Sequence, residues 1–210
     1  MHSDSTKPEG HRLQVHAITQ AKQMKNIEAR KLPGVEGVWV FAFADMIVFA
    51  VMFGSFMFDR QHSAALFEQS RQLLNIHLGG INTLILLTSS MLVVTAVHAI
   101  KHQRQHLAAR LFGLAFACGL AFIGCKIFEY QEKFQAGISM LSNDFFMYYF
   151  IMTGMHLGHV VVGSIVLAAL WRKSRSPSPG TLAMYESGAI YWHMVDLLWV
   201  CLFPLLYLVR

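Results

Sequence analysis

Charged residues are scarce in this sequence. Asp, Glu, Lys and Arg make up 14% of its 210 residues, against about 25% in a typical soluble protein. Hydrophobic residues make up 55%, and the mean hydropathy is +0.44. The apolar residues fall in long uninterrupted runs, which excludes an ordinary soluble domain and predicts an integral membrane protein.

Cysteine is also rare. Cys118, Cys125 and Cys201 all lie in apolar runs, and the first two would be about 10.5 Å apart along one helix, too far for a disulfide. We interpret them as packing residues, which leaves the redox compartment open. The sequence shows no signal-peptide pattern, because its first apolar run is long enough to span a membrane and remain there.

The sequence lacks the features of a nucleic-acid-binding surface. Its net charge is +5 and its pI about 9.2, but no basic stretch is interleaved with aromatic residues. The basic residues instead lie between the apolar runs, where they act as membrane topology signals. We therefore expect no nucleic-acid partner.

Five apolar runs are each long enough for a helix of about 20 residues that crosses a bilayer. Because hydrocarbon offers the backbone no hydrogen-bond partner, we predict that each run is helical. The fold class is therefore an all-α integral membrane protein, with a polar tail at 1–32 and a five-helix membrane domain at 33–210. The predicted spans are 38–58, 79–100, 110–130, 145–171 and 188–209.

The distribution of Lys and Arg predicts the topology. Twelve of them lie in the N-terminal tail, the second linker and the fourth linker, whereas four lie on the other side. The positive-inside rule then places the N-terminus in the cytoplasm and the C-terminus in the periplasm. Five spans put the two termini on opposite sides, so the span count and the charges agree.

Seven ionisable residues inside the predicted spans need an explanation, because such a residue costs about 2.5–3.5 kcal/mol at mid-helix. Residues three apart share a helix face, so Lys126 could neutralise Glu129, and His193 could neutralise Asp196. We predict a polar seam across the third, fourth and fifth spans that either holds the helices together or contacts lipid headgroups near the span ends. A proton or ion path is the alternative. The seven residues are Asp45, Lys126, Glu129, His156, His159, His193 and Asp196.

A metal site is the other chemistry that these residues could support. The di-iron bundle pattern needs paired Glu-x-x-His motifs, but Glu129 is followed three residues later by Glu132. We therefore predict no metal or haem in this chain. The competing hypothesis is a self-sufficient membrane metalloenzyme that uses His156, His159, His193, Glu129 and Asp196.

Aromatic and small residues give two packing predictions. The four tryptophans lie mostly near the span ends, as in an interfacial aromatic belt. Gly154 and Gly158 have the spacing of a close helix approach, which favours packing within the chain.

Several motifs, in order along the chain, resemble those of subunit III of the haem–copper oxidases. One is the stretch Asn82–Ser90, with Asn82 and Thr83, and another is Glu129-Tyr130 followed by Glu132. The third is the stretch Phe146–Gly163, with Thr153 and Gly154. The last comprises Glu186 and the stretch Tyr191–Trp199, with Trp192 and Trp199. The resemblance covers about 33–210.

Within that family, the opening Leu-Pro-Gly-Val-Glu-Gly-Val-Trp-Val-Phe (32–41) and the five-helix form resemble the NorE type. That type is associated with nitric oxide reductase in denitrifying bacteria. The five-helix subunit III of quinol oxidases is the close rival. Asp45 stands where many family members have Glu, and the two additional N-terminal helices of long members, which frame a lipid cleft, are missing.

The resemblance implies an accessory subunit in the bacterial inner membrane. Its expected partner is the catalytic subunit of a haem–copper oxidase or a nitric oxide reductase, which would carry the haem and the copper or iron. The chain itself would have no catalytic residue. Members of the family bind phospholipid, and binding of that kind here would need a partner to supply the missing wall of the cleft. A membrane assembly factor is a further alternative.

Overall fold

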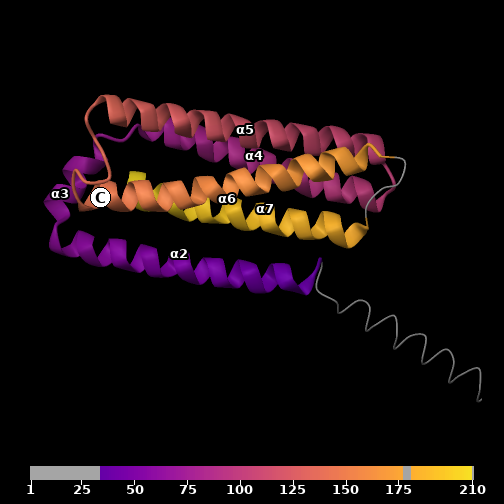
Figure 1. The fold of residues 1–210 in the computed structure, drawn as a ribbon, viewed down its shortest axis with the longest axis horizontal. Helices are drawn as coiled ribbons and strands as arrows, with labels where there is room; N and C mark the ends of the chain where they lie inside the picture. Colours follow the sequence, from indigo (N-terminus) through magenta and orange to yellow (C-terminus); the bar gives the residue numbers. More distant parts are fainter. Residues whose placement is uncertain (1–33, 177–180, 210) are drawn as a thin grey trace, which may run out of the picture. The chain divides into compact units, whose positions relative to one another are not determined.

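The computed structural model describes residues 34–176 and 181–209, and these residues are helical or in short connections, without a β-strand. Five helices in this part are long and apolar enough to cross a membrane, as predicted. The predicted tail, 1–32, lies outside the described residues. The elements are α2 (Glu36–His62), α3 (Ala64–Arg71), α4 (Ile76–Lys101), α5 (Gln105–Gln135), α6 (Asp144–Ser174), α7 (Leu182–Phe203) and η1 (Pro204–Leu208) (Figure 1).

Side chains in the connections define several helix ends. The Asn75 side chain accepts hydrogen bonds from the first turn of α4, and Asn143 caps α6 through the Phe146 N–H at 2.9 Å, as N-cap residues do. Pro204 has no N–H to continue the α-helical pattern. The chain therefore passes into the wider π-turn η1, with Val209 N bonded to Pro204 O at 3.0 Å.

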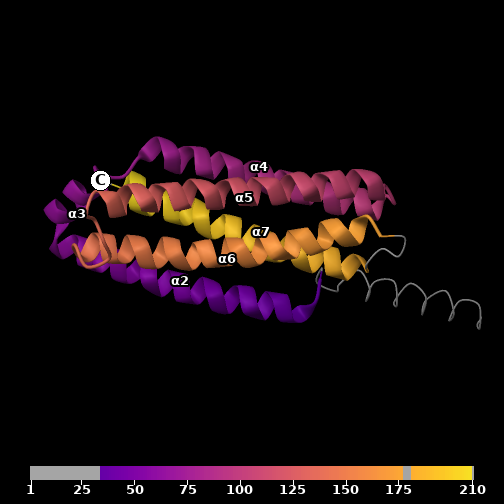
Figure 2. The ribbon, with the colours of Figure 1, turned by 45° about the horizontal axis from the view of Figure 1, so that its top comes forward.

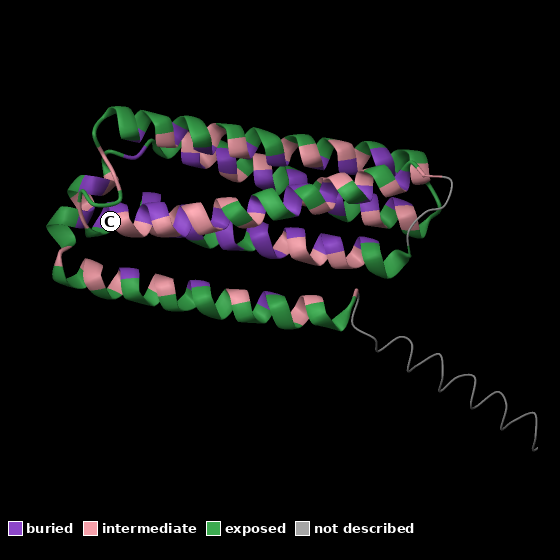
Figure 3. Cartoon of the chain, in the orientation of Figure 1, coloured by how far each residue is buried: buried purple, intermediate pink, exposed green. Residues whose placement is uncertain are grey.

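Four of the spanning helices form a bundle in which α4 packs on α5, α5 on α6, α6 on α7, and α7 on α4 (Figures 1 and 2). The remaining span, α2, lies along α6 and α7 on the outside of this bundle. In the most hydrophobic 18 residues of each span, 50% are buried in the last span but only 17% in α2. Figure 3 shows the mostly exposed surface of α2. Most of the α2 surface is therefore left for lipid or a partner protein.

The long linker between the first two spans contains α3, which the hydrophobic pattern did not predict. Phe67 of α3 is buried between Phe56 and Phe145, with ring centroids 5.3 and 5.7 Å away. Arg71 donates to Tyr207 O at 3.0 Å and pairs with Glu68, and the hydrogen bond to Glu68 raises the pKa of the guanidinium. This short helix thus lies at the same end of the bundle as η1 (Figure 1).

At the helix interfaces, the aromatic belt does not include Trp192 and Trp199, and the close helix approach does not occur at Gly154 and Gly158. Trp192 and Trp199 are completely buried in the bundle instead of lying in an interfacial belt. A methyl group at Gly158 would meet no atom within 4 Å, whereas one at Gly163 would lie 2.7 Å from the Trp192 ring. The close approach of α6 and α7 therefore occurs at Gly163, where the missing side chain admits an indole.

Candidate functional site

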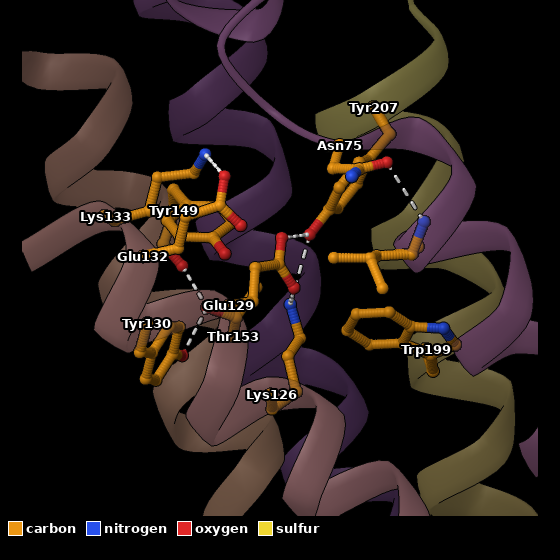
Figure 4. Close-up of polar contacts among 12 residues, drawn as sticks. Asn75, Lys126, Glu129, Tyr130, Glu132, Lys133, Tyr149, Thr153, Trp199 and Tyr207 are labelled. Carbon is orange, nitrogen blue, oxygen red and sulfur yellow. Dashed lines mark hydrogen bonds and ion pairs between the residues drawn. The ribbon is translucent and has the colours of Figure 1, made fainter. Parts of the chain in front are cut away.

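The most extensive polar cluster joins α5 to η1 (Figure 4). Lys126 Nζ contacts Glu129 Oε2 at 2.8 Å, as the three-residue spacing predicted. Tyr207 donates its hydroxyl to Glu129 Oε1 at 2.5 Å and accepts from Lys126 at 3.1 Å. All three side chains are essentially inaccessible to solvent. The Lys126–Glu129 pair has no net charge, and both its ammonium and its carboxylate are hydrogen-bonded.

Aromatic rings surround the Lys126 ammonium. It lies 4.8 Å from the Trp199 ring centroid and 5.3 Å from that of Tyr149, with the Tyr207 and Tyr130 rings within 6 Å. Cations are attracted to aromatic faces, by about 2 kcal/mol or more when desolvated. This cage stabilises the buried charge and lets a lysine remain inside the membrane domain.

Hydroxyl groups extend the cluster to the other bundle helices. Tyr130 on α5 lies 2.6 Å from Thr153 Oγ1 on α6, and Thr153 itself donates to Tyr149 O. Trp199 on α7 donates its indole N–H to Thr83 Oγ1 on α4 at 3.0 Å. The cluster around Glu129 therefore connects α4, α5, α6 and α7, and Figure 4 shows most of its members.

A second pair connects α2 to α6. His159 Nε2 lies 3.1 Å from Asp45 Oδ1, and His159 Nδ1 lies 2.8 Å from the Met155 carbonyl oxygen. A carbonyl oxygen only accepts, so Nδ1 carries a proton, and the contact with Asp45 needs one more. Whether that proton resides on Nε2 or on the carboxyl, the pair has no net charge, which suits its place in the span.

The predicted pairing of His193 with Asp196 does not form. His193 Nδ1 instead lies 2.7 Å from Ser90 Oγ on α4. Both carboxyl oxygens of Asp196 are buried without a hydrogen-bond partner in the described part of the chain. The spacing places both residues on one face of α7, but the imidazole of His193 is hydrogen-bonded to Ser90, which lies 103 residues away in sequence.

His156 lies apart from these pairs. Its ring packs between Phe122 and Trp199, with centroids 5.6 and 5.2 Å away, and neither ring nitrogen has a partner among the described residues. Asn82 on α4 is equally buried, and its amide is also unpartnered there. The predicted seam is therefore three separate groups, around Glu129, His159 and His193. His156, Asn82 and Asp196 stay without a hydrogen-bond partner among the described residues.

The remaining motif residues have structural contacts. Trp192 donates to Ser89 Oγ at 3.1 Å, and Ser89 donates to Ala115 O, which joins α7, α4 and α5. Glu186 pairs with Lys101 at 2.9 Å and also accepts from the Gly34 N–H. Glu132 is half exposed, 3.9 Å from Lys133, and a methyl group at Gly154 would meet only the Tyr130 hydroxyl, at 3.9 Å.

The five residues of the metalloenzyme hypothesis do not converge. Glu129 is bonded to Lys126, His159 to Asp45, and His193 to Ser90. Throughout residues 34–176 and 181–209, no three His, Cys, Asp or Glu side chains are close enough to share a metal ion. The arrangement is therefore suited to joining helices.

Sequence reasoning missed three important partners: Tyr207, Ser90 and Tyr148. Tyr148 donates to Asp59 Oδ2 at 2.6 Å and so ties α6 to the end of α2. Each of the three lies more than 75 residues from its partner in sequence, so no local spacing could have revealed the contact.

The fold defines a multi-pass helical membrane protein. The profile of the family "Cytochrome c oxidase subunit III" matches residues 26–209. The chain is 33% identical to cytochrome c oxidase subunit 3 of Alkalihalophilus pseudofirmus over 178 residues, covering 82% of this chain and 84% of that protein. It is 30% identical to cytochrome c oxidase subunit 3 of Synechocystis over 82% of this chain and 74% of that protein.

A quinol oxidase subunit is also similar. The chain is 28% identical to quinol oxidase subunit 3 of Bacillus spizizenii over 195 residues, covering 92% of this chain and 95% of that protein. The family profile covers almost the whole chain. The protein belongs to the cytochrome c oxidase subunit III family.

Proposed function

We propose that this chain is the accessory subunit III of a haem–copper respiratory complex and stabilises its catalytic subunit. The family match over residues 26–209 carries the proposal. The internal groups agree with it, because the ionisable side chains around Glu129 and His159 bond to one another or to neighbouring helices. The haem and the copper or iron would belong to the catalytic subunit, and this chain would have no activity of its own.

The outer surface supports a role within a larger membrane complex. α2 exposes an apolar surface that includes Val40, Phe43, Ile47 and Val51, each more than 60% exposed. The bundle does not cover this surface, which is suited to lipid or to the spanning helices of a partner subunit.

The bacterial inner membrane is the proposed location, with the N-terminus in the cytoplasm. The end of the membrane domain at which α4 and α6 finish carries Lys101, Arg104, Arg172 and Lys173. By the positive-inside rule this end faces the cytoplasm, and the end covered by α3 faces the periplasm.

The particular complex that we propose is one linked to nitric oxide reduction, as in the NorE type. The support is the resemblance of the segment 32–41, together with the five-helix form. A quinol oxidase is the second candidate, favoured by the similarity to the Bacillus spizizenii subunit over 92% of this chain.

Purification of the tagged chain from its native membrane in mild detergent tests both the assignment as a subunit and the choice of complex. We expect a stoichiometric partner with haem absorption, and turnover with nitric oxide, oxygen, quinol or cytochrome c assigns the complex. Oxygen turnover with quinol would replace the nitric oxide assignment by the quinol oxidase. Recovery of the chain alone, while the oxidase or reductase is fully active without it, would overturn the subunit assignment in favour of an assembly factor.

A further inference from the structure

A groove of about 630 Å³ lies outside the polar clusters, between the first turns of α5 and the last turns of α6. Six of the residues that line it indicate its function: His106, Arg110, Gly113, Leu114, Trp171 and Arg175. His106, Arg110 and Leu114 are four residues apart on α5, and Trp171 and Arg175 are four apart around the end of α6. That spacing places each set on one helix face.

The rim of the groove is basic and lacks a counter-charge. Arg110 and Arg175 are exposed, and no acidic residue lines the groove. Within residues 34–176 and 181–209, neither arginine forms an ion pair. At this end of the domain Glu186 is paired with Lys101 at 2.9 Å. Two guanidinium groups thus face the groove without a carboxylate to neutralise them.

The floor of the groove is apolar. At 1.5 Å per residue, Leu114 lies about 6 Å deeper along its helix than Arg110, and Trp171 lies about 6 Å deeper than Arg175. Trp171 fits against α5 because Gly113 has no side chain, and a methyl group there would lie 3.1 Å from the indole nitrogen. The Arg175 guanidinium lies over the same indole, 5.7 Å from the ring centroid. The groove therefore has charge at the level of lipid headgroups and apolar surface below it.

We propose that this groove is a binding site for the phosphate of an anionic phospholipid, with Arg110 and Arg175 as its ligands. Guanidinium groups bind phosphate oxygens through paired hydrogen bonds, and basic pockets between spanning helices are suited to anionic headgroups. The first acyl chain segments would lie on Leu114 and Trp171. A free phosphate ion has the same recognition chemistry, but the apolar floor favours the lipid.

The test uses the full-length chain in detergent, with lipid binding measured by native mass spectrometry. The probes are dioleoyl phosphatidylglycerol, dioleoyl phosphatidylcholine and inorganic phosphate. The test variant is Arg110→Gln with Arg175→Gln. The control is Arg104→Gln with Arg172→Gln, which removes the same charge at the same end but outside this groove. Lipid-free unfolding midpoints show whether both variants fold.

We expect the wild type to prefer phosphatidylglycerol over phosphatidylcholine. The test variant should bind phosphatidylglycerol about thirtyfold more weakly, since each arginine near a membrane surface contributes about a fivefold effect. The control should change binding by no more than about twofold. Equal losses in the two variants, or equal binding of the two lipids, would overturn the site. Competition by millimolar inorganic phosphate would retain the phosphate site but overturn the lipid assignment.

Discussion

The bundle α4–α7 and the helix α2 are joined to the rest of the domain in different ways. The bundle helices interlock through buried tryptophans and glycines, and one hydrogen-bonded cluster links all four of them. α2 buries only Ala42, Phe49 and Phe56. Internal packing therefore contributes much less to the position of α2.

Polar contacts at three depths hold α2 in place. At its start, the Gly34 and Val35 N–H groups bond to the side chains of Glu186 and Ser187 at 3.2 and 2.9 Å. At mid-span it has the Asp45–His159 pair, and near its end the Tyr148 hydroxyl bonds to Asp59. A helix bound mainly through a few directional contacts can be released by single substitutions, whereas the bundle requires the loss of a buried charge or of close packing.

The largest effect should follow from breaking the bundle at Glu129. Glu129→Leu leaves the Lys126 ammonium buried without its carboxylate, which we expect to cost about 3–5 kcal/mol of unfolding free energy. Unfolding by SDS in mixed micelles, followed by tryptophan fluorescence, measures this loss. The double variant with Lys126→Met should recover most of it, because no uncompensated charge remains.

Glu132→Gln is the matched control, since that side chain is half exposed, and we expect a change within about 0.5 kcal/mol. A stability of Glu129→Leu within about 1 kcal/mol of the wild type would contradict the role assigned to the pair, given the penalty expected for a lone buried charge.

The second effect tests the packing of the bundle. Gly163→Ala places a methyl group 2.7 Å from a Trp192 ring carbon, and overpacking of this kind typically costs about 1–3 kcal/mol. Gly158→Ala on the same helix meets no atom within 4 Å. It should stabilise the chain by about 0.5–1 kcal/mol through the better helix propensity of alanine. Equal effects of the two substitutions would show that α6 and α7 do not approach at Gly163.

The spans were predictable because the bilayer imposes their length and composition. All five predicted ranges overlap the observed helices, and the helices extend further, as α5 does from Gln105 to Gln135. These extensions contain polar residues, with Gln105 and His106 at one end of α5 and Glu132 and Lys133 at the other, so hydropathy alone could not include them. The helix α3 was missed because eight residues with Phe67 and Leu66 among polar neighbours give no span signal.

The polar pairs show where local spacing is insufficient. Lys126 and Glu129 meet as predicted, but His193 and Asp196 have the same spacing and do not. Spacing puts two residues on one face, and tertiary neighbours decide which of them bond. The sequence did contain one signal for the buried face of α2. Its buried residues Ala42, Phe49 and Phe56 recur every seven positions. That spacing is typical of a stripe packed along other helices.

The third prediction concerns the contact between Asp45 and His159, which holds α2 at mid-span. Asp45→Leu leaves His159 Nε2 without a partner, and we expect a loss of about 1–2 kcal/mol. Hydrogen exchange resolved by peptide should accelerate in α2 more than in α5 or α7. Asp45→Asn is the informative control, because its amide can donate to a neutral His159 and should retain most of the protection. Exchange that is unchanged in Asp45→Leu would mean that the pair does not hold α2.

The smallest effect tests the contact near the end of α2. Tyr148→Phe removes only the hydroxyl that bonds to Asp59 and keeps the ring packed against Phe56, 5.7 Å away. The expected loss is about 0.5–1.5 kcal/mol, the usual contribution of one hydrogen bond, and faster exchange should be confined to the last turns of α2 and to α3. In combination with Asp45→Leu, additive losses would mean that the two contacts hold α2 independently. A combined loss well below the sum would mean that each contact depends on the other, so that α2 docks as one cooperative unit.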